Sequence, residues 1–425
     1  MSLIVQKYGG SSVCDAPSIV RVAQRIVDTV AAGHQVVVIV SAMGDTTDDL
    51  IDLANQVSAA PDPREFDMLL TSGERISMAL LAMAIHDLGY EGRSFTGSQA
   101  GLITDSQHGA ARIVEVTPVR LQEALADGAI PIVAGFQGFS RETRDITTLG
   151  RGGSDTTAVA IAVALGADLC EIYTDVDGVF SADPRVVPAA RQLPRLEYEE
   201  MLELAAAGAK VLHLRCVEYA RRADLPLQVR SSFSQHPGTS IMSRYRMEAE
   251  AKRMEQPIIA GVAVDLSDAK VTITSVPDEP GRAAAIFQAL AGADINIDMI
   301  VQNVSAKTTG RTDVTFTCPS GSIDTAKAAL DRAREVIGFE ELLHDEHIAK
   351  VSLVGAGMKQ HPGVSATFFA ALAEAGVNVE LISTSEIRIS VITRADKAEA
   401  AARAVHSAFG LDADGEAVVY AGTGR

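Results

Sequence analysis

Lys7 ends a short apolar run and is followed by an aromatic residue and two glycines, in the stretch Lys7-Tyr8-Gly9-Gly10. Glycine lets backbone N–H groups approach an anion closely, and a lysine adds a positive charge. The stretch therefore indicates a site for phosphate or another anion. A tight turn with an exposed lysine is the alternative, because glycine-rich turns are common.

A second glycine-rich stretch, Gly150-Arg151-Gly152-Gly153, follows a β-rich run and precedes an apolar helix predicted over Asp155–Leu165. Ser154 or Asp155 is expected to cap that helix. A glycine-rich loop that opens onto a helix N-terminus attracts anions, whereas a plain capped turn would need neither the arginine nor three glycines. The patterns GxxxxGK[ST] and GxGxxG are absent, so the sequence supports neither an ordinary P-loop nor a dinucleotide fold.

Three further stretches place polar side chains at the ends of predicted elements. Tyr173–Arg185 follows a buried strand, at the strand end where open α/β sheets hold ligands. Glu74 lies in the first turn of a predicted helix, and Lys210 lies at the start of another. Taken singly, each has a structural explanation: a solvated loop, an acid favoured by the helix dipole, and a surface lysine.

The elements that must position these residues alternate up to about Ser243. Nearly continuous apolar strands between helices indicate a largely parallel sheet covered on both faces. This part is therefore predicted to be a three-layer α/β/α domain. The expected strands are 36–40, 130–134, 170–174 and 227–229, and the expected helices are 18–32, 74–88, 117–126, 155–165 and 211–223.

The second part of the chain contains a repeat. Pro280-Gly281 and Pro362-Gly363 are 82 residues apart (362 minus 280), and Asn296 and Asn378 have the same offset. Each copy reads strand, Pro-Gly turn, helix, strand, so two small α+β, ferredoxin-like units are expected. A further strand is expected in each copy, at 311–318 and at 386–393.

Composition limits the function. The chain has 425 residues, 47% of them hydrophobic, which suffices for several cores. A formal charge of −18 argues against binding a nucleic-acid backbone, although a small anionic ligand can still occupy a locally positive pocket. No signal peptide or membrane-length apolar run is recognised, so a cytoplasmic protein without a membrane partner is expected. Four cysteines without paired spacing predict neither a disulfide framework nor a zinc site, and no metal ligands are predicted.

Eight stretches stand in a recognisable order: KYGGSS, SAMGDTTDDL, TSGERIS, SFTGSQAG, GFQG, TTLGRGGSDTTA, YTDVDGVFSADPR and GAKVLH. Together they resemble the aspartokinases of the amino acid kinase superfamily, and the duplicated tail resembles the paired ACT domains of those enzymes. The resemblance covers the whole chain and points to the bacterial type regulated by lysine and threonine. It implies ATP- and Mg²⁺-dependent phosphorylation of the side-chain carboxylate of L-aspartate to 4-phospho-L-aspartate, the first step toward lysine, threonine and methionine.

The resemblance also implies catalytic and substrate residues. Lys7 and Lys210 match the two lysines that face the phosphates, and Asp155 matches the aspartate that orients them. Arg151 matches the residue that binds the α-carboxylate of L-aspartate, and Glu74 the residue that binds its amine. Ser41, Thr47 and Gly152 are the other implied substrate contacts.

The nucleotide site follows from the same resemblance. Phe180 stands where relatives often carry tyrosine, so stacking is expected to survive and one hydroxyl contact to be lost. The implied ATP-binding residues are Lys7, Tyr8, Gly9, Gly10, Tyr173, Thr174, Asp175, Asp177, Phe180, Asp183, Arg185 and Lys210.

In this family the ACT domains bind end-product amino acids between repeats of different chains. The loops Val276–Ala284 and Lys359–Ala366 are therefore the candidate sites for L-lysine and L-threonine, which are expected to inhibit together. A purely structural dimerisation module is the alternative. The candidate effector residues are Asp278, Pro280, Gly281, Arg282, Ala283, Asn296, Ile297, Asp298 and Gln302 in the first copy, and His361, Pro362, Gly363, Val364, Asn378, Val379, Thr384, Ser385 and Glu386 in the second.

The expected division is a kinase domain at 1–245, a linker at 246–262 and ACT domains at 263–343 and 344–425. The linker is charged and could instead form an exposed helix. The expected assembly is a homodimer, or a heterotetramer whose short regulatory subunit starts at Met247 or Met254.

Two other functions stay open. A glutamate, acetylglutamate or nucleotide kinase of the same superfamily would share the phosphate loops, but it should lack the combination of SGERIS and paired ACT domains. A non-catalytic amino acid sensor would keep the repeats, yet it could discard Lys7, Asp155 or Lys210, all of which are present.

Overall fold

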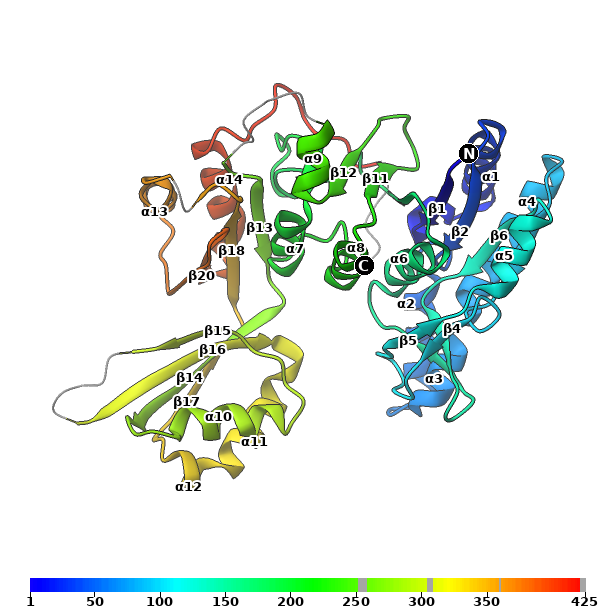
Figure 1. Ribbon diagram of the computed structural model, residues 1–425. Coiled ribbons are helices and arrows are strands. Elements are labelled where there is room, and N and C mark those ends of the chain that lie inside the picture. Colours follow the sequence, from blue (N-terminus) through cyan, green and yellow to red (C-terminus); the bar gives the residue numbers. More distant parts are fainter. Residues whose placement is uncertain (251–257, 304–308, 359–360, 421–425) are drawn as a thin grey trace. The chain divides into compact units, whose positions relative to one another are not determined.

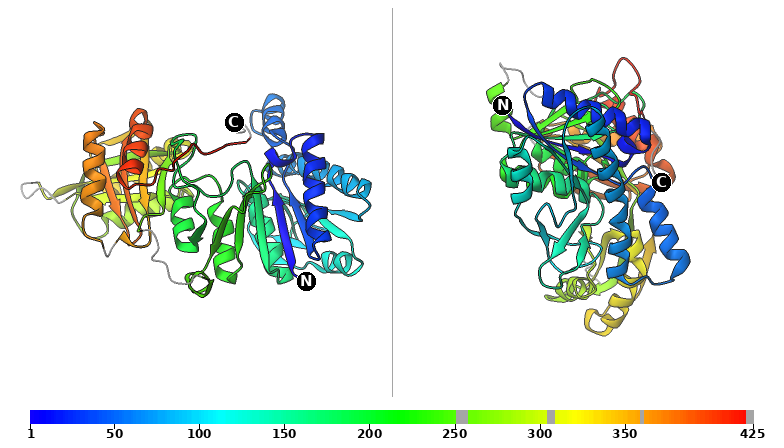
Figure 2. Two further views of the ribbon diagram at one scale, coloured as in Figure 1. Left: turned by 90° about the horizontal axis from the view of Figure 1, so that it is seen from above. Right: turned by 90° about the vertical axis from the view of Figure 1, so that its right-hand side faces the viewer.

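The computed structural model describes residues 1–250, 258–303, 309–358 and 361–420. Figures 1 and 2 show its helices and strands. The chain divides into two compact units: the first holds the described residues of 1–206, 210–256 and 413–425, and the second holds those of 207–209 and 257–412. Each unit has its own sheets and core.

The first unit is built on an eight-stranded sheet in the order β10-β12-β11-β9-β1-β2-β6-β3. Strand β2 is apolar on both faces and buried from Val36 to Val40. The neighbours pair in parallel except for β11 and β12. The strands are β1 (Leu3–Tyr8), β2 (Gln35–Val40), β3 (Gly92–Phe95), β6 (Ile130–Ala134), β9 (Leu169–Thr174), β10 (Arg195–Glu197), β11 (Leu227–Ser231) and β12 (Thr239–Met242).

Helices cover both faces of this sheet, so the predicted three-layer α/β/α architecture is confirmed (Figure 1). Helices α1 and α4 pack together on β2, while α6 packs on β1 and β9 and contacts α8. Helix α6 is apolar all round and almost wholly buried, as expected of a central helix. The helices are α1 (Ala16–Ala31), α2 (Thr46–Val57), α3 (Pro63–Leu70), α4 (Ser72–Asp87), α5 (Val119–Ala126), α6 (Gly153–Leu165), α7 (Tyr198–Ala206), α8 (Leu214–Ala223) and α9 (Arg244–Glu250).

Strand β1 lies at a switch point of the sheet. It pairs with β2 on one side and with β9 on the other, with Tyr8 opposite Tyr173 at the carboxyl ends. Open α/β sheets bind ligands outside the carboxyl ends of their strands at such a point. The topology therefore brings the first glycine stretch and the loop Tyr173–Arg185 side by side.

A second, four-stranded sheet in the order β5-β4-β7-β8 was not predicted. Its strands have only three or four residues each, too few for a clear alternation of apolar and polar side chains. They are β4 (Leu102–Thr104), β5 (Ile113–Val116), β7 (Gln137–Ser140) and β8 (Ile146–Thr148), and β8 leads directly into the loop Gly150–Gly153.

The second unit contains two four-stranded antiparallel sheets, β15-β16-β14-β17 and β13-β18-β20-β19. Each carries helices, which matches the predicted pair of α+β units. The strands are β13 (Gly261–Asp265), β14 (Asp268–Pro277), β15 (Asp298–Gln302), β16 (Arg311–Pro319), β17 (Leu342–Asp345), β18 (Ile348–Val354), β19 (Leu381–Thr384) and β20 (Arg388–Arg394). The helices are α10 (Arg282–Ala291), α11 (Ile323–Arg332), α12 (Arg334–Ile337), α13 (Val364–Glu374) and α14 (Ala398–Ala408).

The two small units are not consecutive segments, so the structure departs from the predicted division at 343/344. Strand β13 precedes the first repeat in sequence but pairs with β18 of the second, and β17 extends past residue 343 to pair with β14. The first repeat is therefore inserted between two parts of the second. The predicted linker also begins inside helix α9 and ends inside β13, and the described residues after 412 belong to the first unit.

The predicted strands agree with β2, β6, β9 and β11 to within two residues at either end. The predicted helices correspond to α1, α4, α5, α6 and α8, but none starts at the predicted residue. Helices α1, α4 and α6 begin two residues earlier, α5 begins two residues later, and α8 begins at Leu214 instead of Val211. Among the described residues, only the run Pro63–Asp87, which is α3 and α4 together, is long and apolar enough to span a membrane, and half of its most apolar window is buried inside the fold. Its packing against α1 and β3 gives that apolar character a structural explanation.

Candidate active site

Lys7 and Asp155 meet at the switch point. Lys7 Nζ lies 2.6 Å from Asp155 Oδ1, and their side chains are only 12% and 11% exposed. Lys7 is near the end of β1, and Asp155 is in the first turn of α6, which packs on that strand. A positive charge is thus held, with little access to water, where a helix N-terminus and glycine N–H groups also favour an anion.

The loop before α6 needs glycine at two positions. Gly150 has φ 74° and Gly152 has φ 68°, a left-handed region that other residues rarely adopt. Gly152 is the N-cap residue, and no side chain caps the helix, so the predicted cap by Ser154 or Asp155 was wrong. Asp155 lies one turn further in, where its carboxylate pairs with Lys7. Because Gly152 has no side chain, the N-cap residue provides no side-chain acceptor for the N–H groups in the first turn of α6.

Glu74 is a buried carboxyl group beside the first glycine stretch. It is 3% exposed, and one carboxylate oxygen accepts a 3.2 Å hydrogen bond from the Ala42 N–H. The other oxygen, Oε2, has no partner. Burial raises the pKa of Glu74 to about 7, against the effect of its backbone hydrogen bonds. A buried, half-satisfied carboxyl group suits an incoming ammonium group.

Ala42 connects Glu74 to Gly10. A Cβ on Gly10 would lie 3.0 Å from the Ala42 carbonyl oxygen and 2.8 Å from that of Gly44, so only glycine fits without a shift. A Cβ on Gly73 would likewise lie 2.7 Å from the Ala42 side chain. These close approaches place Glu74 next to the loop that contains Gly9 and Gly10. They also explain why residues 10 and 73 are both glycine.

The other predicted substrate residues surround the same region. Arg151 is exposed in the glycine loop, and within the described part of the chain it has no hydrogen bond or ion pair. Ser41 follows β2 and donates its N–H to Tyr8, while Thr47 lies in the first turn of α2. Arg151 is thus a free guanidinium at the mouth of the helix-terminus site.

The predicted nucleotide loop is tied to the first glycine stretch. The Gly9 N–H donates to the Tyr173 carbonyl at 3.3 Å. Arg185 pairs with Asp175 at 2.9 Å and also lies 3.7 Å from Asp183. Thr174 donates to Asp175, and Phe180 is half-buried in the same loop. Residues from two distant parts of the sequence therefore form one continuous rim.

Tyr8 and Tyr173 do not offer their rings to this rim. Both are buried, at 0% and 1% exposure, and stack on each other with ring centroids 4.6 Å apart. Their hydroxyl groups donate to Gln6 and Glu171 inside the core. Contact with a nucleotide at these two positions is therefore open only to the backbone.

Lys210 is exposed in the loop between α7 and α8, not at the start of a helix as predicted. It has no partner in the described structure. The next helix begins only at Leu214, because His213 provides its N-cap by accepting from the Arg215 N–H. A lysine on such a loop remains available for a ligand.

His213 and Asp67 are site-supporting residues that were not predicted. A Cβ on Gly152 would lie 2.3 Å from the His213 ring, so the histidine packs against the glycine loop. Asp67 is fully buried and accepts from His108, the Gly109 N–H and both the N–H and hydroxyl of Thr148. Asp67 therefore anchors the strand that enters the loop. The stretch GAKVLH contained His213, but nothing in the sequence marked Asp67.

The first predicted effector loop lines a hollow of about 290 Å³ in the second unit. Its wall includes Asp278, Pro280, Gly281, Arg282, Ala283 and Gln302, all of them predicted, together with Val276, Thr312 and Val314. Asn296, Ile297 and Asp298 are not part of this wall. Gly281, with φ 97°, caps α10 and shapes the turn.

The second copy repeats this geometry. Gly363, with φ 107°, caps α13 as Gly281 caps α10. His361 and Pro362 precede it, and Val364 begins the helix. Of the other predicted residues, Asn378 accepts from Thr393 through its carbonyl, and Val379 follows it. Thr384 ends β19, and Ser385 and Glu386 lie in the turn after that strand.

Ion pairs connect the two copies reciprocally. Lys350 of the second copy is 3% exposed and lies 3.1 Å from Asp298 of the first, 3.0 Å from Asp268 and 3.4 Å from Asp265. Lys270 of the first copy pairs with Glu380 of the second. Asp298 and Glu380 occupy equivalent positions, two residues after Asn296 and Asn378. Ion pairs between the two copies thus involve Asp298, which is itself a predicted effector residue, and Glu380, which follows the predicted effector residue Val379.

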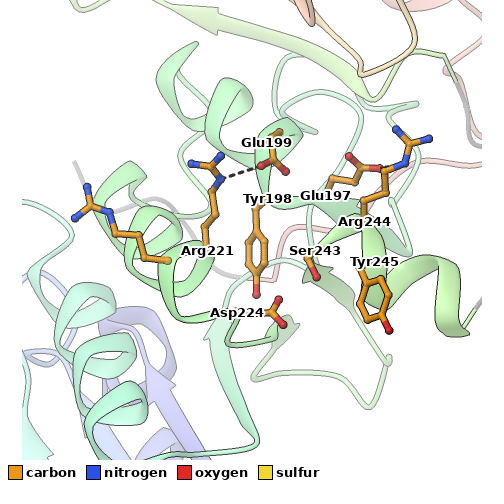
Figure 3. A pocket seen from close by; sticks show the side chains of 9 residues that line it. Glu197, Tyr198, Glu199, Arg221, Asp224, Ser243, Arg244 and Tyr245 are labelled. Atoms are coloured by element: carbon orange, nitrogen blue, oxygen red, sulfur yellow. Dashed lines mark hydrogen bonds and ion pairs between the residues drawn. The ribbon is translucent and has the colours of Figure 1, made fainter.

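A larger hollow, about 620 Å³, lies elsewhere on the first unit (Figure 3). Arg221 pairs with Glu199 across it at 2.8 Å, and Arg244 approaches Glu197 at 3.9 Å. None of the predicted catalytic or binding residues lines it. The lining carries three acidic and three basic side chains, so it has no excess of either charge to attract an ion.

Comparison with known proteins agrees with this geometry. Residues 2–231 match the amino acid kinase family, and residues 270–338 and 351–409 match the ACT domain. The chain is 63% identical over 425 residues to the aspartokinase of Mycobacterium tuberculosis, covering 100% of both chains. The structure of E. coli aspartokinase III in complex with aspartate and ADP (R-state) has a TM-score of 0.82 at 25% identity and covers 96% of this chain and 99% of that one. The same enzyme in complex with lysine and aspartate (T-state) gives a TM-score of 0.69 at 25% identity, covering 95% and 99%.

Proposed function

The chain belongs to the aspartokinases of the amino acid kinase family, and from that premise we propose that it transfers the γ-phosphoryl group of ATP to the side-chain carboxylate of L-aspartate. The products are ADP and 4-phospho-L-aspartate. The observation that carries the proposal is the Lys7–Asp155 pair at the N-terminus of α6, whose side chains have little access to water.

The reaction requires that the negative charge on the reacting groups be neutralised. The side-chain carboxylate of free aspartate has a pKa of about 3.9 and is ionised at neutral pH, so no general base is needed. A carboxylate oxygen forms a bond to the γ-phosphorus as the bond to the β–γ bridging oxygen breaks, and ADP takes up the electron pair. Repulsion between the two anions is the main obstacle, which positioned cations and N–H donors lower.

Each residue has a role in this proposal. Lys7 neutralises charge on the transferred phosphoryl group, and Asp155 fixes its ammonium group. Lys210 supplies a second cation from its exposed loop. Arg151 binds the α-carboxylate of the substrate, and Glu74 accepts its ammonium group through the unpartnered oxygen.

Magnesium would come with the nucleotide. Within the described residues there is no group of three or more His, Cys, Asp or Glu side chains that could hold a metal ion. The described residues thus offer no such cluster, and the phosphates of ATP are the ligands that we propose for the metal. Bound there, Mg²⁺ would neutralise phosphate charge.

Regulation is the second part of the proposal. E. coli aspartokinase III has been solved with lysine bound. We assign lysine and threonine, acting together, to the two ACT turns, because the hollow at Val276–Ala283 is small and is lined by residues with charged or polar side chains, Asp278, Arg282 and Gln302, which suit an amino acid. The enzyme would then act at the first step toward lysine, threonine and methionine, in the cytoplasm.

We also propose that the enzyme is an oligomer. A homodimer, or a heterotetramer with a short subunit started inside the chain, would provide ACT interfaces. Of the two candidate starts, Met247 is buried in α9, and Met254 lies outside the described residues.

The test is ADP formation with Mg²⁺-ATP and a panel of amino acids, followed by lysine and threonine singly and together. Turnover on aspartate that is lost only with both effectors supports both parts. Turnover on glutamate or acetylglutamate instead would point to another member of the superfamily. Binding of lysine or threonine without any turnover would favour a sensor.

A further inference from the structure

The last described residues of the chain lie on the predicted nucleotide loop. Three backbone hydrogen bonds hold them on this loop and on the residues just beyond it: Tyr420 N–H to Asp175 O at 2.9 Å within the loop, and Ala417 N–H to Pro188 O at 2.8 Å and Ala413 N–H to Ala189 O at 2.7 Å after it. Val419 forms an antiparallel bridge with Val176. We call residues 413–420 the C-terminal strap.

Tyr420 fixes two positions of the loop at once. Its N–H donates to the carbonyl of Asp175, and its hydroxyl donates to Asp177 Oδ2 at 3.0 Å. Ser234 donates to the other oxygen of Asp177. Both oxygens of that carboxylate are therefore held, one from the strap and one from the loop after β11.

The ring of Tyr420 is also held. It stacks on Phe233 with centroids 5.9 Å apart and planes within 10°. Phe233 in turn lies under the Arg21 guanidinium, 4.5 Å from its ring centroid. The aromatic contact orients the phenol, so the hydroxyl reaches Asp177 without the entropy loss of a free side chain.

The rest of the loop depends on the same residues. Asp175 pairs with Arg185 at 2.9 Å, so the residue that accepts from the Tyr420 backbone also positions a predicted nucleotide-binding arginine. Removing the strap would free the Asp175 carbonyl and one oxygen of Asp177. The loop would then have to order itself when a nucleotide binds, which weakens binding.

We propose that Tyr420, at the end of the C-terminal strap, is a positioning residue for the nucleotide loop Thr174–Arg185 and sets the affinity of the enzyme for ATP. This inference rests on the proposed function, which assigns that loop to ATP. Tyr420 acts through Asp175 and Asp177 and need not touch the nucleotide.

The test uses the full chain with two variants. Tyr420→Phe keeps the ring stack on Phe233 and removes the hydroxyl hydrogen bond to Asp177, whereas Tyr420→Ala removes both the stack and that hydrogen bond. The backbone hydrogen bond to Asp175 remains available in both variants. Loss of the hydroxyl should raise the KM for ATP and the Kd for ADP about three- to tenfold, the scale of one hydrogen bond. Tyr420→Ala should have the larger effect. The kcat and the KM for aspartate should change less than about twofold, since the proposed residues at those sites are untouched.

Tyr245→Phe is the matched control, because Tyr245 is 81% exposed and lies on α9. Calorimetric titration with ADP measures the effect of the strap on nucleotide affinity without requiring turnover. If the wild type binds ADP but does not phosphorylate aspartate, the proposed reaction fails while the strap is still tested. Unchanged ADP affinity in both Tyr420 variants would overturn the inference, as would an equal loss of affinity for ADP and aspartate, which would indicate a general structural defect.

A double-mutant cycle tests the route. If the hydroxyl acts through Asp177, Tyr420→Phe should have almost no additional effect on ADP affinity in an Asp177→Ala background, which leaves the hydroxyl no side-chain acceptor at that position. Full additivity of the two changes would overturn that route.

Discussion

Lys7 Nζ and Asp155 Oδ1 are 2.6 Å apart, although one residue belongs to the first strand and the other to the helix that packs on it from much later in the sequence. The pair connects the two glycine-rich loops, and the helix N-terminus and the lysine charge at this point both favour an anion. A cation held this way is pre-oriented, so no reorganisation is needed when charge develops on a phosphoryl group.

Lys7→Ala should lower kcat by about a hundredfold or more while changing the KM for aspartate only a few-fold, because the charge acts on the transferred group. Steady-state rates of ADP formation measure both constants. Lys397→Ala, at an exposed lysine of the second unit, is the control. A Lys7→Ala enzyme with normal kcat would remove Lys7 from the mechanism.

Asp155→Asn should cost much of the same activity by releasing the ammonium group of Lys7. Because the two residues act as one unit, the double variant should be little worse than Lys7→Ala alone. Rates of the two single variants and the double variant form the cycle. Independent, additive losses would show that Asp155 does not work through Lys7.

Arg151→Ala should raise the KM for aspartate about tenfold or more, the scale of a lost charge-assisted pair, and leave kcat much less affected. Arg222→Ala controls for loss of an exposed arginine on the same unit. Equal KM values for wild type and Arg151→Ala would refute the assignment of the α-carboxylate.

Glu74 predicts a pH dependence. Its pKa in the folded protein is raised from 4.5 to about 7 by burial, and only the ionised form accepts an ammonium group. The KM for aspartate should therefore rise by about tenfold for each pH unit below 7. Glu74→Gln should bind aspartate weakly at every pH and lose this slope. If the KM of the wild type for aspartate stayed constant between about pH 5.5 and 7, the assignment would be contradicted.

The same shift affects stability with a definite sign. The unfolded chain ionises Glu74 near its ordinary pKa of 4.5, whereas the folded protein does so only near 7. The folded state thus holds more protons in that window, and its stability falls as the pH rises through it. Glu74→Gln should melt higher than wild type at pH 8 without substrate, by differential scanning calorimetry.

Lys350→Met should destabilise the second unit by about 3 kcal/mol or more, because it leaves three aspartates around an apolar side chain. Hydrogen exchange of β14, β15 and β18 in the full chain locates the effect. Lys327→Met on α11 is the control. Unchanged protection of those strands would show that the cluster contributes no net stability.

The sequence allowed the central architecture to be predicted because long apolar strands and amphipathic helices have clear periods. Strand β6 was predicted at its observed bounds, 130–134. Short strands such as β4 were missed, since three residues show no period. The exchange of β13 into the second repeat was also missed, because pairing partners are not encoded locally.

The site was predicted unevenly for the same reason. Lys7, Glu74 and Arg151 lie in motifs whose glycines and charges are visible in the sequence. Asp67 and Tyr420 stabilise loops from far away in the chain, and each looks like an ordinary surface residue until the fold brings its partner near.

Trapping the product tests the central claim most directly. An acyl phosphate reacts with hydroxylamine to give a hydroxamate, so Mg²⁺-ATP, L-aspartate and hydroxylamine should yield aspartyl hydroxamate in the same amount as ADP. The Lys7→Ala enzyme should yield almost none. ADP without hydroxamate, or hydroxamate only from another amino acid, would contradict the phosphorylation of the aspartate side chain.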